Sequence, residues 1–309
     1  MKTVGYHILS LLIIAGMAIS CSKTNSVLPD SDLEARVFTN VPYGDDPLQK
    51  IDVYLPANRS YNTPLIFLIH GGGFFAGDKS DFSTHSNQLA NEGFAVININ
   101  YRLIDTTGAN AAPPQHRESK IKITEQLADI RSIINFVDKQ ASSWIVSATK
   151  WAITGHSVGG TLSLLYAYGS HNSDNRIKVA GNWAGVTDLS FPDETYAQTI
   201  SPFVLEVLTR GVGVPVKNEN KAAYMAVSPY WVLQAGVGKP TINIRPEFNQ
   251  VSGTTDFSKL QYAALTELLI GKNIDNQSIE VSGADHSFTK SGNWELVLNE
   301  TIEFFEDEL

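Results

Sequence analysis

The chain has 309 residues, of which 43% are hydrophobic and 10% aromatic, enough apolar material for a large buried core. Its net charge of −9 at pH 7 argues against binding to nucleic acid or to an anionic membrane surface. The only cysteine, Cys21, excludes an internal disulfide and a metal site built on several cysteines.

The first twenty residues have the pattern of an export signal. A short positive end at Met1-Lys2 precedes the apolar run Ile8–Ile19, which is too short to span a bilayer but suits a signal-peptide core. The run ends at Ala18-Ile-Ser-Cys21, which resembles a bacterial lipobox with Ala18 where Leu is usual. We therefore expect residues 1–20 to be removed and Cys21 to be lipidated, anchoring an exported protein to the periplasmic or outer face of the bacterial envelope. The alternatives are an ordinary cleaved signal peptide and a buried free thiol.

Residues 21–33 are mostly polar and are expected to form a flexible tether. The remainder, 34–309, has the length of one large domain. Its pattern predicts short apolar strands alternating with longer amphipathic helices. The expected strands are Arg36–Val41, Gln49–Leu55, Leu65–Ile69, Ala95–Ile99, Trp151–Thr154, Lys178–Asn182, Thr241–Val251 and Ser278–Val281. The expected helices are Asp81–Gly93, Ile123–Lys139, Val158–Tyr168, Phe257–Gly271 and Trp294–Glu306.

This alternation predicts an α/β fold, with a mostly parallel sheet covered by helices on both faces and ligands bound at the carboxyl ends of the strands. Two stretches interrupt it. Asp105–Ser119 is a loop rich in Gly, Ala and Pro, and Leu189–Val237 is a longer insertion that mixes aromatics, prolines and glycines. We expect this second stretch to be a lid or cap over the site. A surface excursion without a role is the alternative.

Gly155-His-Ser-Val-Gly159 lies between the strand Trp151–Thr154 and the helix Val158–Tyr168. This is the strand–turn–helix setting of a nucleophile elbow, in which glycines let strand and helix approach closely and Ser157 stands clear of the backbone. The helix N-terminus favours negative charge formed during attack. We therefore predict that Ser157 is a nucleophile.

A serine hydroxyl needs a base within hydrogen-bonding reach, and histidine suits that proton transfer. His286 lies just past the last predicted strand and before the final helix, whereas the other six histidines lack such a position or belong to other motifs. His156, next to the nucleophile, is expected to point away from its hydroxyl. We predict that His286 is the base; a solvated loop histidine is the alternative.

The base needs a carboxylate to fix its tautomer and stabilise the imidazolium. Asp256 follows a predicted strand and precedes a helix, about thirty residues before His286. We predict it as the third catalytic member, although a plain helix N-cap would look similar. Asp188 is the reserve candidate. Asp285 is a poor one because it adjoins His286 and neighbouring side chains diverge.

His70-Gly-Gly-Gly73 directly follows the strand Leu65–Ile69. Consecutive glycines expose backbone N–H groups, so the amides of Gly72 or Gly73, together with that of Val158, are expected to form an oxyanion hole. Taken alone, such a turn could bind a phosphate or simply bend the chain.

These motifs, with Asn98-Ile-Asn-Tyr-Arg-Leu103, resemble the carboxylesterases of the α/β-hydrolase superfamily, and most of all the bacterial group of acetyl-xylan/feruloyl esterases and kynurenine formamidase-like enzymes. The resemblance covers roughly Val41 to Leu309. It implies an eight-stranded α/β-hydrolase sheet, triad positions for Asp256 and His286, and a Tyr101-Arg102 brace behind the oxyanion loop. Val158 stands where the family has the smaller Ala, which would narrow an acyl pocket.

The expected activity is hydrolysis of a carboxylic ester through an acyl-enzyme, without metal or cofactor. Family analogy adds a small-molecule or oligosaccharide ester as substrate, such as acetyl or feruloyl groups on plant polysaccharide. The alternatives are an arylformamidase-type amide hydrolase and a binding lipoprotein of the same fold with a decayed site. The expected membrane contact is through the lipid alone.

Overall fold

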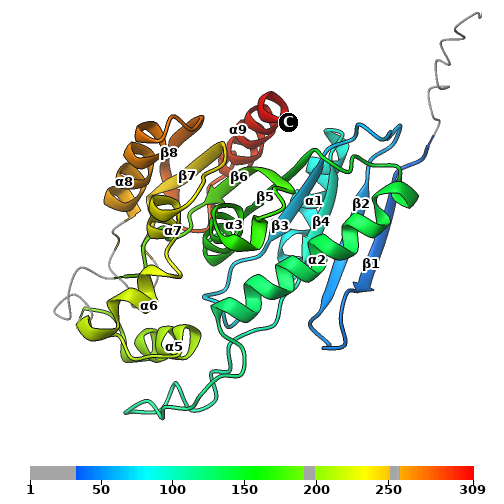
Figure 1. Cartoon of the computed structure of the whole chain (residues 1–309). Coiled ribbons are helices and arrows are strands. Elements are labelled where there is room, and N and C mark those ends of the chain that lie inside the picture. Colours follow the sequence, from blue (N-terminus) through cyan, green and yellow to red (C-terminus); the bar gives the residue numbers. More distant parts are fainter. Residues whose placement is uncertain (1–32, 191–198, 251–255, 257) are drawn as a thin grey trace, which may run out of the picture. The chain divides into compact units, whose positions relative to one another are not determined.

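The computed structural model describes residues 33–190, 199–250, 256 and 258–309. The predicted signal peptide, Cys21 and nearly all of the tether lie outside these residues. The described strands form one eight-stranded sheet (Figure 1). They are β1 (Arg36–Pro42), β2 (Lys50–Leu55), β3 (Leu65–Ile69), β4 (Ala95–Ile99), β5 (Trp151–Gly155), β6 (Ile177–Trp183), β7 (Thr241–Phe248) and β8 (Asn276–Asp285).

The strand order is β1-β2-β4-β3-β5-β6-β7-β8. The pairs β1–β2 and β2–β4 are antiparallel, and every pair from β4 to β8 is parallel, which confirms the expected mostly parallel sheet. The carboxyl ends of β3, β5, β7 and β8 therefore lie along one edge of the sheet, where such sheets bind ligands.

The helices follow the predicted alternation; α3 has the predicted bounds, and the ends of the others are shifted. They are η1 (Lys79–Phe82), α1 (Ser83–Asn91), α2 (Ile123–Trp144), α3 (Val158–Tyr168), η2 (Ser170–Asn172), α5 (Pro202–Val212), η3 (Asn218–Asn220), α6 (Lys221–Met225), α7 (Pro229–Ala235), α8 (Ser258–Gly271) and α9 (Asn293–Glu308). The helix expected over Asp81–Gly93 is divided into a 3₁₀ turn and α1. Asp78 caps the 3₁₀ turn by accepting a hydrogen bond from the Ser80 amide.

Two apolar clusters cover the two faces of the sheet. One face packs against α2, α3 and α8, through residues such as Ile130, Leu162 and Leu265. The other packs against α1 and α9, through residues such as Leu89 and Phe305. Because both faces are covered, β3, β4 and β5 are buried along their whole length, as their near-continuous apolar sequences predict.

The described part of the insertion carries α5, α6 and α7, and it contacts the other irregular stretch, residues 105–119. Arg210 of α5 is 1% exposed. Its guanidinium donates to the carbonyl oxygens of Asp105, Thr107 and Gln115 and pairs with Glu206 at 2.7 Å. Phe203 of α5 packs edge-on against Phe75, 5.2 Å between ring centres. The insertion therefore reaches the glycine-rich loop after β3.

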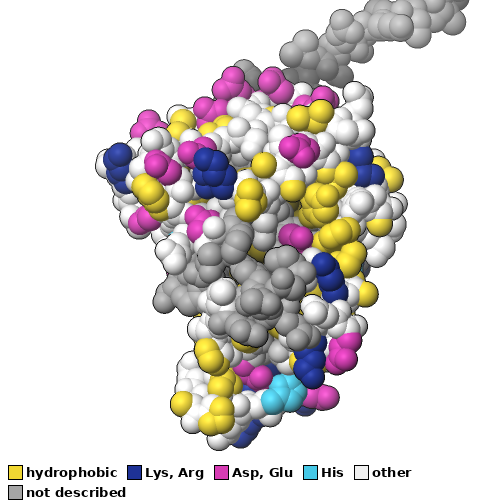
Figure 2. All heavy atoms as spheres, turned by 90° about the vertical axis from the view of Figure 1, so that its left-hand side faces the viewer, with side chains coloured by type: hydrophobic (Ala, Val, Ile, Leu, Met, Phe, Trp, Pro, Cys, Tyr) yellow, Lys and Arg dark blue, Asp and Glu magenta, His cyan; other side chains and the backbone are white. Residues whose placement is uncertain are grey.

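Figure 2 shows acidic side chains spread over the upper part of one face, with apolar side chains between them. Exposed apolar residues include Leu260 and Ile270 on α8. None of the helices in the described parts of the chain is long and apolar enough to cross a membrane.

Candidate active site

Ser157 lies on a sharp turn between β5 and α3, with a positive φ of 55°. This conformation is strained for a serine, and it is held in place by the Ser157 N–H, which donates to Trp183 O at 2.7 Å. A Cβ on Gly155 would lie 2.4 Å from Ile69 O, and one on Gly159 would lie 2.2 Å from the same oxygen. The turn therefore has the strand–turn–helix geometry of the predicted elbow, and its glycines are required by close backbone contacts.

His286 directly follows β8 and reaches Ser157. Its Nε2 lies 3.0 Å from Ser157 Oγ, so a neutral imidazole can accept the hydroxyl proton. Its backbone carbonyl accepts a hydrogen bond of 2.7 Å from His156 Nε2. The predicted nucleophile and base therefore lie within hydrogen-bonding distance of each other, while Nε2 of His156 has another partner. The sequence interpretation missed what His156 does instead, which is to hold the backbone of the base.

The predicted third member does not contact the base. His286 Nδ1 lies 2.5 Å from Asn249 Oδ1, and Asn249 is the first residue after β7. The Asp256 carboxylate instead accepts hydrogen bonds from the backbone N–H of Asn249 and from Ser258 at the start of α8. The reserve candidate, Asp188, accepts from Trp231 Nε1 and is not in contact with His286.

Asn249 was not predicted, because a carboxylate was expected to contact the base. The end of β7 was also expected at Val251, whereas the strand ends at Phe248. The signal that could have found Asn249 is its position directly after a parallel strand, at the edge of the sheet where Ser157 and His286 also lie. Asp285, the poor candidate, bonds to Thr289.

The glycine-rich loop after β3 passes directly beside Ser157, since a Cβ on Gly71 would lie 3.1 Å from Ser157 Cβ. Gly72 and Gly73 have φ of 111° and 63°, conformations that favour glycine. Within the described residues, the amides of Gly72, Gly73 and Val158 donate no hydrogen bond. These amides are the donors that the sequence predicts for an oxyanion hole.

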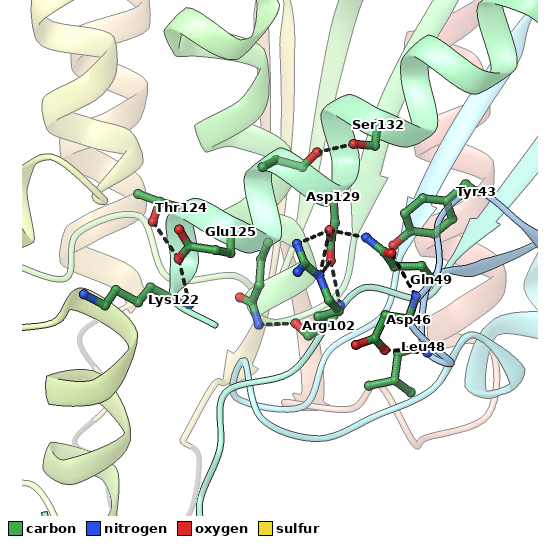
Figure 3. Close-up of polar contacts among 12 residues, drawn as sticks. Tyr43, Asp46, Leu48, Gln49, Arg102, Lys122, Thr124, Glu125, Asp129 and Ser132 are labelled. Carbon is green, nitrogen blue, oxygen red and sulfur yellow. Dashed lines mark hydrogen bonds and ion pairs between the residues drawn. The ribbon is translucent and has the colours of Figure 1, made fainter. Parts of the chain in front are cut away.

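Only half of the brace implied by the resemblance touches this loop. Tyr101 Oη donates to His70 O at 3.1 Å, and the two rings stack with centres 4.4 Å apart. Arg102 instead turns to Asp129 of α2, with Nη2 2.7 Å from Oδ1 (Figure 3). The same carboxylate accepts from Gln49 Nε2, so it ties α2 to the segment before β2.

A buried glutamine supplies a further support of the loop. Gln126 of α2 donates through Nε2 to Phe74 O at 2.7 Å and to Arg102 O at 3.0 Å. Phe74 has a positive φ of 72°, so its backbone is strained. The Gln126 contact was not predicted, because nothing in the sequence separates it from the other polar residues of α2.

Burial makes the surroundings of the base favour neutral imidazoles. Burial and, to a smaller extent, the neighbouring His156 lower the pKa of His286, whereas Asp285 and Asp256 oppose the shift, and the resulting pKa is about 4. Burial also lowers the pKa of His156. A base that stays neutral well below pH 7 can accept a proton from Ser157 over a wide pH range. Among the described residues, no group of three or more His, Cys, Asp or Glu could hold a metal ion.

Comparisons with known proteins place this geometry in context. Among curated sequences, the chain is 24% identical to a kynurenine formamidase of Salmo salar over 57% of this chain and 55% of that protein. It is 26% identical to a probable isoprenylcysteine alpha-carbonyl methylesterase of Arabidopsis thaliana over 72% of this chain and 44% of that protein. The chain therefore spans about half the length of these relatives.

Solved structures share the fold at low sequence identity. A truncated carbohydrate esterase from gut microbiota is 19% identical, with a TM-score of 0.67 over 91% of this chain and 98% of that one. Esterase B from Lactobacillus rhamnosis is 19% identical, with a TM-score of 0.66 over 89% of this chain and 87% of that one. The BD-FAE family model matches residues 51–236, which is more than half of the chain and includes the glycine-rich loop and the elbow. The expected fold and family are thereby confirmed: the chain has the α/β-hydrolase fold and belongs to the BD-FAE family.

Proposed function

We propose that this protein is a serine esterase that hydrolyses carboxylic esters through an acyl-enzyme on Ser157. The observation that carries the proposal is the 3.0 Å contact between Ser157 Oγ and His286 Nε2, close to the amides of Gly72, Gly73 and Val158, which donate no hydrogen bond to any described residue. A hydroxyl, a neutral base and unpaired donors in one place are what acyl transfer requires.

In the proposed mechanism, Ser157 Oγ attacks the ester carbonyl while His286 Nε2 takes its proton. The amides of the glycine-rich loop and of Val158 stabilise the oxyanion, and the position of Val158 at the start of α3 adds the helix dipole. The tetrahedral intermediate expels the alcohol, which receives the proton from His286. Water, activated by His286, then releases the carboxylic acid and regenerates the hydroxyl.

Hydrolysis of p-nitrophenyl acetate and labelling by a fluorophosphonate probe test this proposal. Ser157→Ala is expected to lower kcat at least about a thousandfold and to abolish labelling. Ser132→Ala is the matched control, because Ser132 is exposed on α2 and its hydroxyl bonds only to Ala128 O. Equal rates and absent labelling in wild type and Ser157→Ala would instead support a binding protein with a decayed site.

For the substrate class, we propose acyl groups on carbohydrate, with acetyl or feruloyl esters of plant polysaccharide as the first candidates. Membership of the BD-FAE family and the likeness to a carbohydrate esterase support this choice. Acetate or ferulate release from acetylated and feruloylated xylo-oligosaccharides would test it. If kcat/KM for these substrates stays below that for simple aryl esters, the carbohydrate assignment is wrong.

A second candidate is the hydrolysis of an aryl formamide, because two of the curated relatives are kynurenine formamidases. The same serine and base would serve, and the leaving amine would take its proton from His286. Comparing kcat/KM for N-formylkynurenine and for a matched aryl acetate decides between the two. We expect the ester to be preferred, and a higher value for the formamide would reverse the order of the candidates.

We also propose that Cys21 is lipidated and anchors the exported enzyme to the bacterial cell envelope. The support is the apolar run that ends in Ala18-Ile-Ser-Cys21. Mass analysis of the mature N-terminus would test it, with Cys21→Ser as the control. An unmodified terminus downstream of Cys21 would exclude lipidation.

A further inference from the structure

The His286 imidazole lies between two neutral partners. Nε2 faces the Ser157 hydroxyl at 3.0 Å, and Nδ1 faces Asn249 Oδ1 at 2.5 Å. Since an amide oxygen can only accept, the hydrogen lies on Nδ1 and leaves Nε2 free to accept from the serine. In the part of the chain that the structure describes, no carboxylate oxygen lies within hydrogen-bonding distance of this ring.

The orientation of the Asn249 amide is fixed by its other contacts. Its Nδ2 group donates to Ala184 O at 3.4 Å, which places Oδ1 toward His286. Its backbone N–H donates to Asp256 Oδ2 at 3.0 Å. Asn249 is only 8% exposed, so few other orientations are open to it. The amide is therefore held in the position that fixes the tautomer of the base.

The Asp256 carboxylate is already occupied. Oδ2 accepts from the backbone N–H of Asn249. Oδ1 accepts from the backbone N–H of Ser258 at 2.9 Å and from its hydroxyl at 2.6 Å. These contacts join the end of β7 to the start of α8. Asp256 is thus bonded to Asn249 and Ser258, and it is Asn249 that contacts the imidazole.

From this arrangement we infer that Asn249 is the residue that positions His286 for proton transfer, and that Asp256 acts indirectly by holding Asn249. The inference rests on the proposed esterase function, since it assigns the orienting role in the same site. A neutral amide fixes the tautomer as a carboxylate would, but it stabilises the imidazolium less.

The charged groups around the His286 imidazole set its pKa, and a change in this pKa is what the test must detect. Burial, and after it His156 in the turn between β5 and α3, lower the pKa of His286, while Asp285 on β8 and Asp256 before α8 raise it. The base is active only when neutral, so activity is lost as pH falls through its pKa, which is about 4. A carboxylate placed at Nδ1 would raise this pKa by about 1–3 units.

Three variants separate direct from indirect roles. Asn249→Ala is expected to lower kcat about a hundredfold or more, because the tautomer is no longer fixed. Asn249→Asp is expected to restore much of kcat and to move the acid limb of the pH profile upward by about 1–3 units. Asp256→Asn is expected to lower kcat less than about tenfold, since the side-chain oxygen of the new asparagine can still accept from the backbone N–H of Asn249.

Asp188→Asn serves as the matched control, because Asp188 accepts from Trp231 and Ser190 and does not contact His286. Circular dichroism and thermal unfolding confirm that each variant is folded. The inference is overturned if Asp256→Asn loses about a thousandfold or more while Asn249→Ala keeps near wild-type kcat. A folded Asn249→Asp variant whose acid limb does not move would also overturn it.

A proton NMR measurement reports the contact without relying on turnover. The proton on His286 Nδ1 is expected as a low-field resonance in wild type that disappears in His286→Ala and in Asn249→Ala but persists in Asp256→Asn. If the resonance persists in Asn249→Ala, the assignment fails. If wild type shows the resonance but neither hydrolyses esters nor labels with fluorophosphonate, the positioning role of Asn249 stands and the esterase function fails.

Discussion

The two halves of the candidate site are built in different ways. The proposed nucleophile and the proposed oxyanion donors come from two short turns, after β5 and after β3, whose geometry requires glycines within a few residues. The base and its partner come from the ends of β7 and β8, and they are placed by contacts between residues far apart in the chain. We call the first half the local half, because two short glycine motifs specify it, although its two turns also pack against each other. The second half depends on where β7 ends and on the contacts at the start of α8.

The largest effect is expected from a substitution in the local half of the site. In Gly159→Ala, the new Cβ would lie 2.2 Å from Ile69 O and 2.7 Å from His70 O, so β3 and α3 must separate. We expect a loss of about 3 kcal/mol in unfolding free energy and at least about a hundredfold slower labelling of Ser157. Urea unfolding and fluorophosphonate labelling rates provide the measurements.

Gly271→Ala is the matched control for this change. Gly271 ends α8, and a Cβ there meets no atom within 4 Å. Because alanine restricts the unfolded chain more than glycine, this variant should gain about 0.4–1 kcal/mol and label at the wild-type rate. If Gly159→Ala behaved like Gly271→Ala, the elbow would not depend on close backbone contact.

The difference between the halves also explains what sequence could predict. The bounds of β3, β4 and α3 match the prediction, because each is a continuous apolar segment next to turn residues. By contrast, α2 continues to Trp144, where Ile145 takes a left-handed φ of 57° and ends it. The strand β8 extends to Asp285, because an edge strand tolerates exposed polar residues.

The residue that contacts His286 Nδ1 shows most clearly what could not be predicted from the sequence. Ser157 and His286 could be chosen from motif order and position, and the structure brings them to 3.0 Å. Asp256 satisfied the same rules, since it follows β7 and precedes α8. Which of Asn249 and Asp256 meets the imidazole is decided by where β7 ends and by the Ser258 contacts. Neither is visible as a periodicity or a motif.

An intermediate effect tests whether the local half also needs support from a distance. Gln126→Leu removes the donor to Phe74 O and to Arg102 O. Among the described residues, the carbonyl of the strained Phe74 then accepts only from the Ile104 amide. We expect kcat to fall about tenfold with little change in KM, because the oxyanion loop contributes mainly in the transition state. Loss of the buried bond should also lower the unfolding free energy by about 1–3 kcal/mol.

Gln88→Leu on α1 is the matched control for Gln126→Leu, since the Gln88 side chain is exposed. It should leave kcat unchanged. A rise in KM at constant kcat in Gln126→Leu would show that the glutamine shapes substrate binding and does not support the oxyanion donors.

The smallest expected effect concerns the cluster of aromatic rings formed by Phe82, His85, His156 and Trp294, of which His156 also neighbours the His286 ring. His85 packs against Trp294, with ring centres 4.3 Å apart, and within the described residues its buried Nδ1 has no hydrogen-bond partner. Burial, with a contribution from His156, lowers the pKa of His85 to about 4, below its ordinary value. The unfolded chain therefore takes up a proton that the folded chain refuses, and stability falls as pH decreases from about 7 toward 4.

His85→Leu should reduce the number of protons taken up on unfolding by up to about one. The unfolding free energy should therefore fall less between pH 7 and pH 5 than it does in wild type, and this difference is the measurement. Phe82→Leu is the matched control, because it removes packing from the same cluster without removing a titratable group. It should lower stability by a similar amount at both pH values. An unchanged pH dependence in His85→Leu would mean that His85 takes up its proton equally in the folded and unfolded chain.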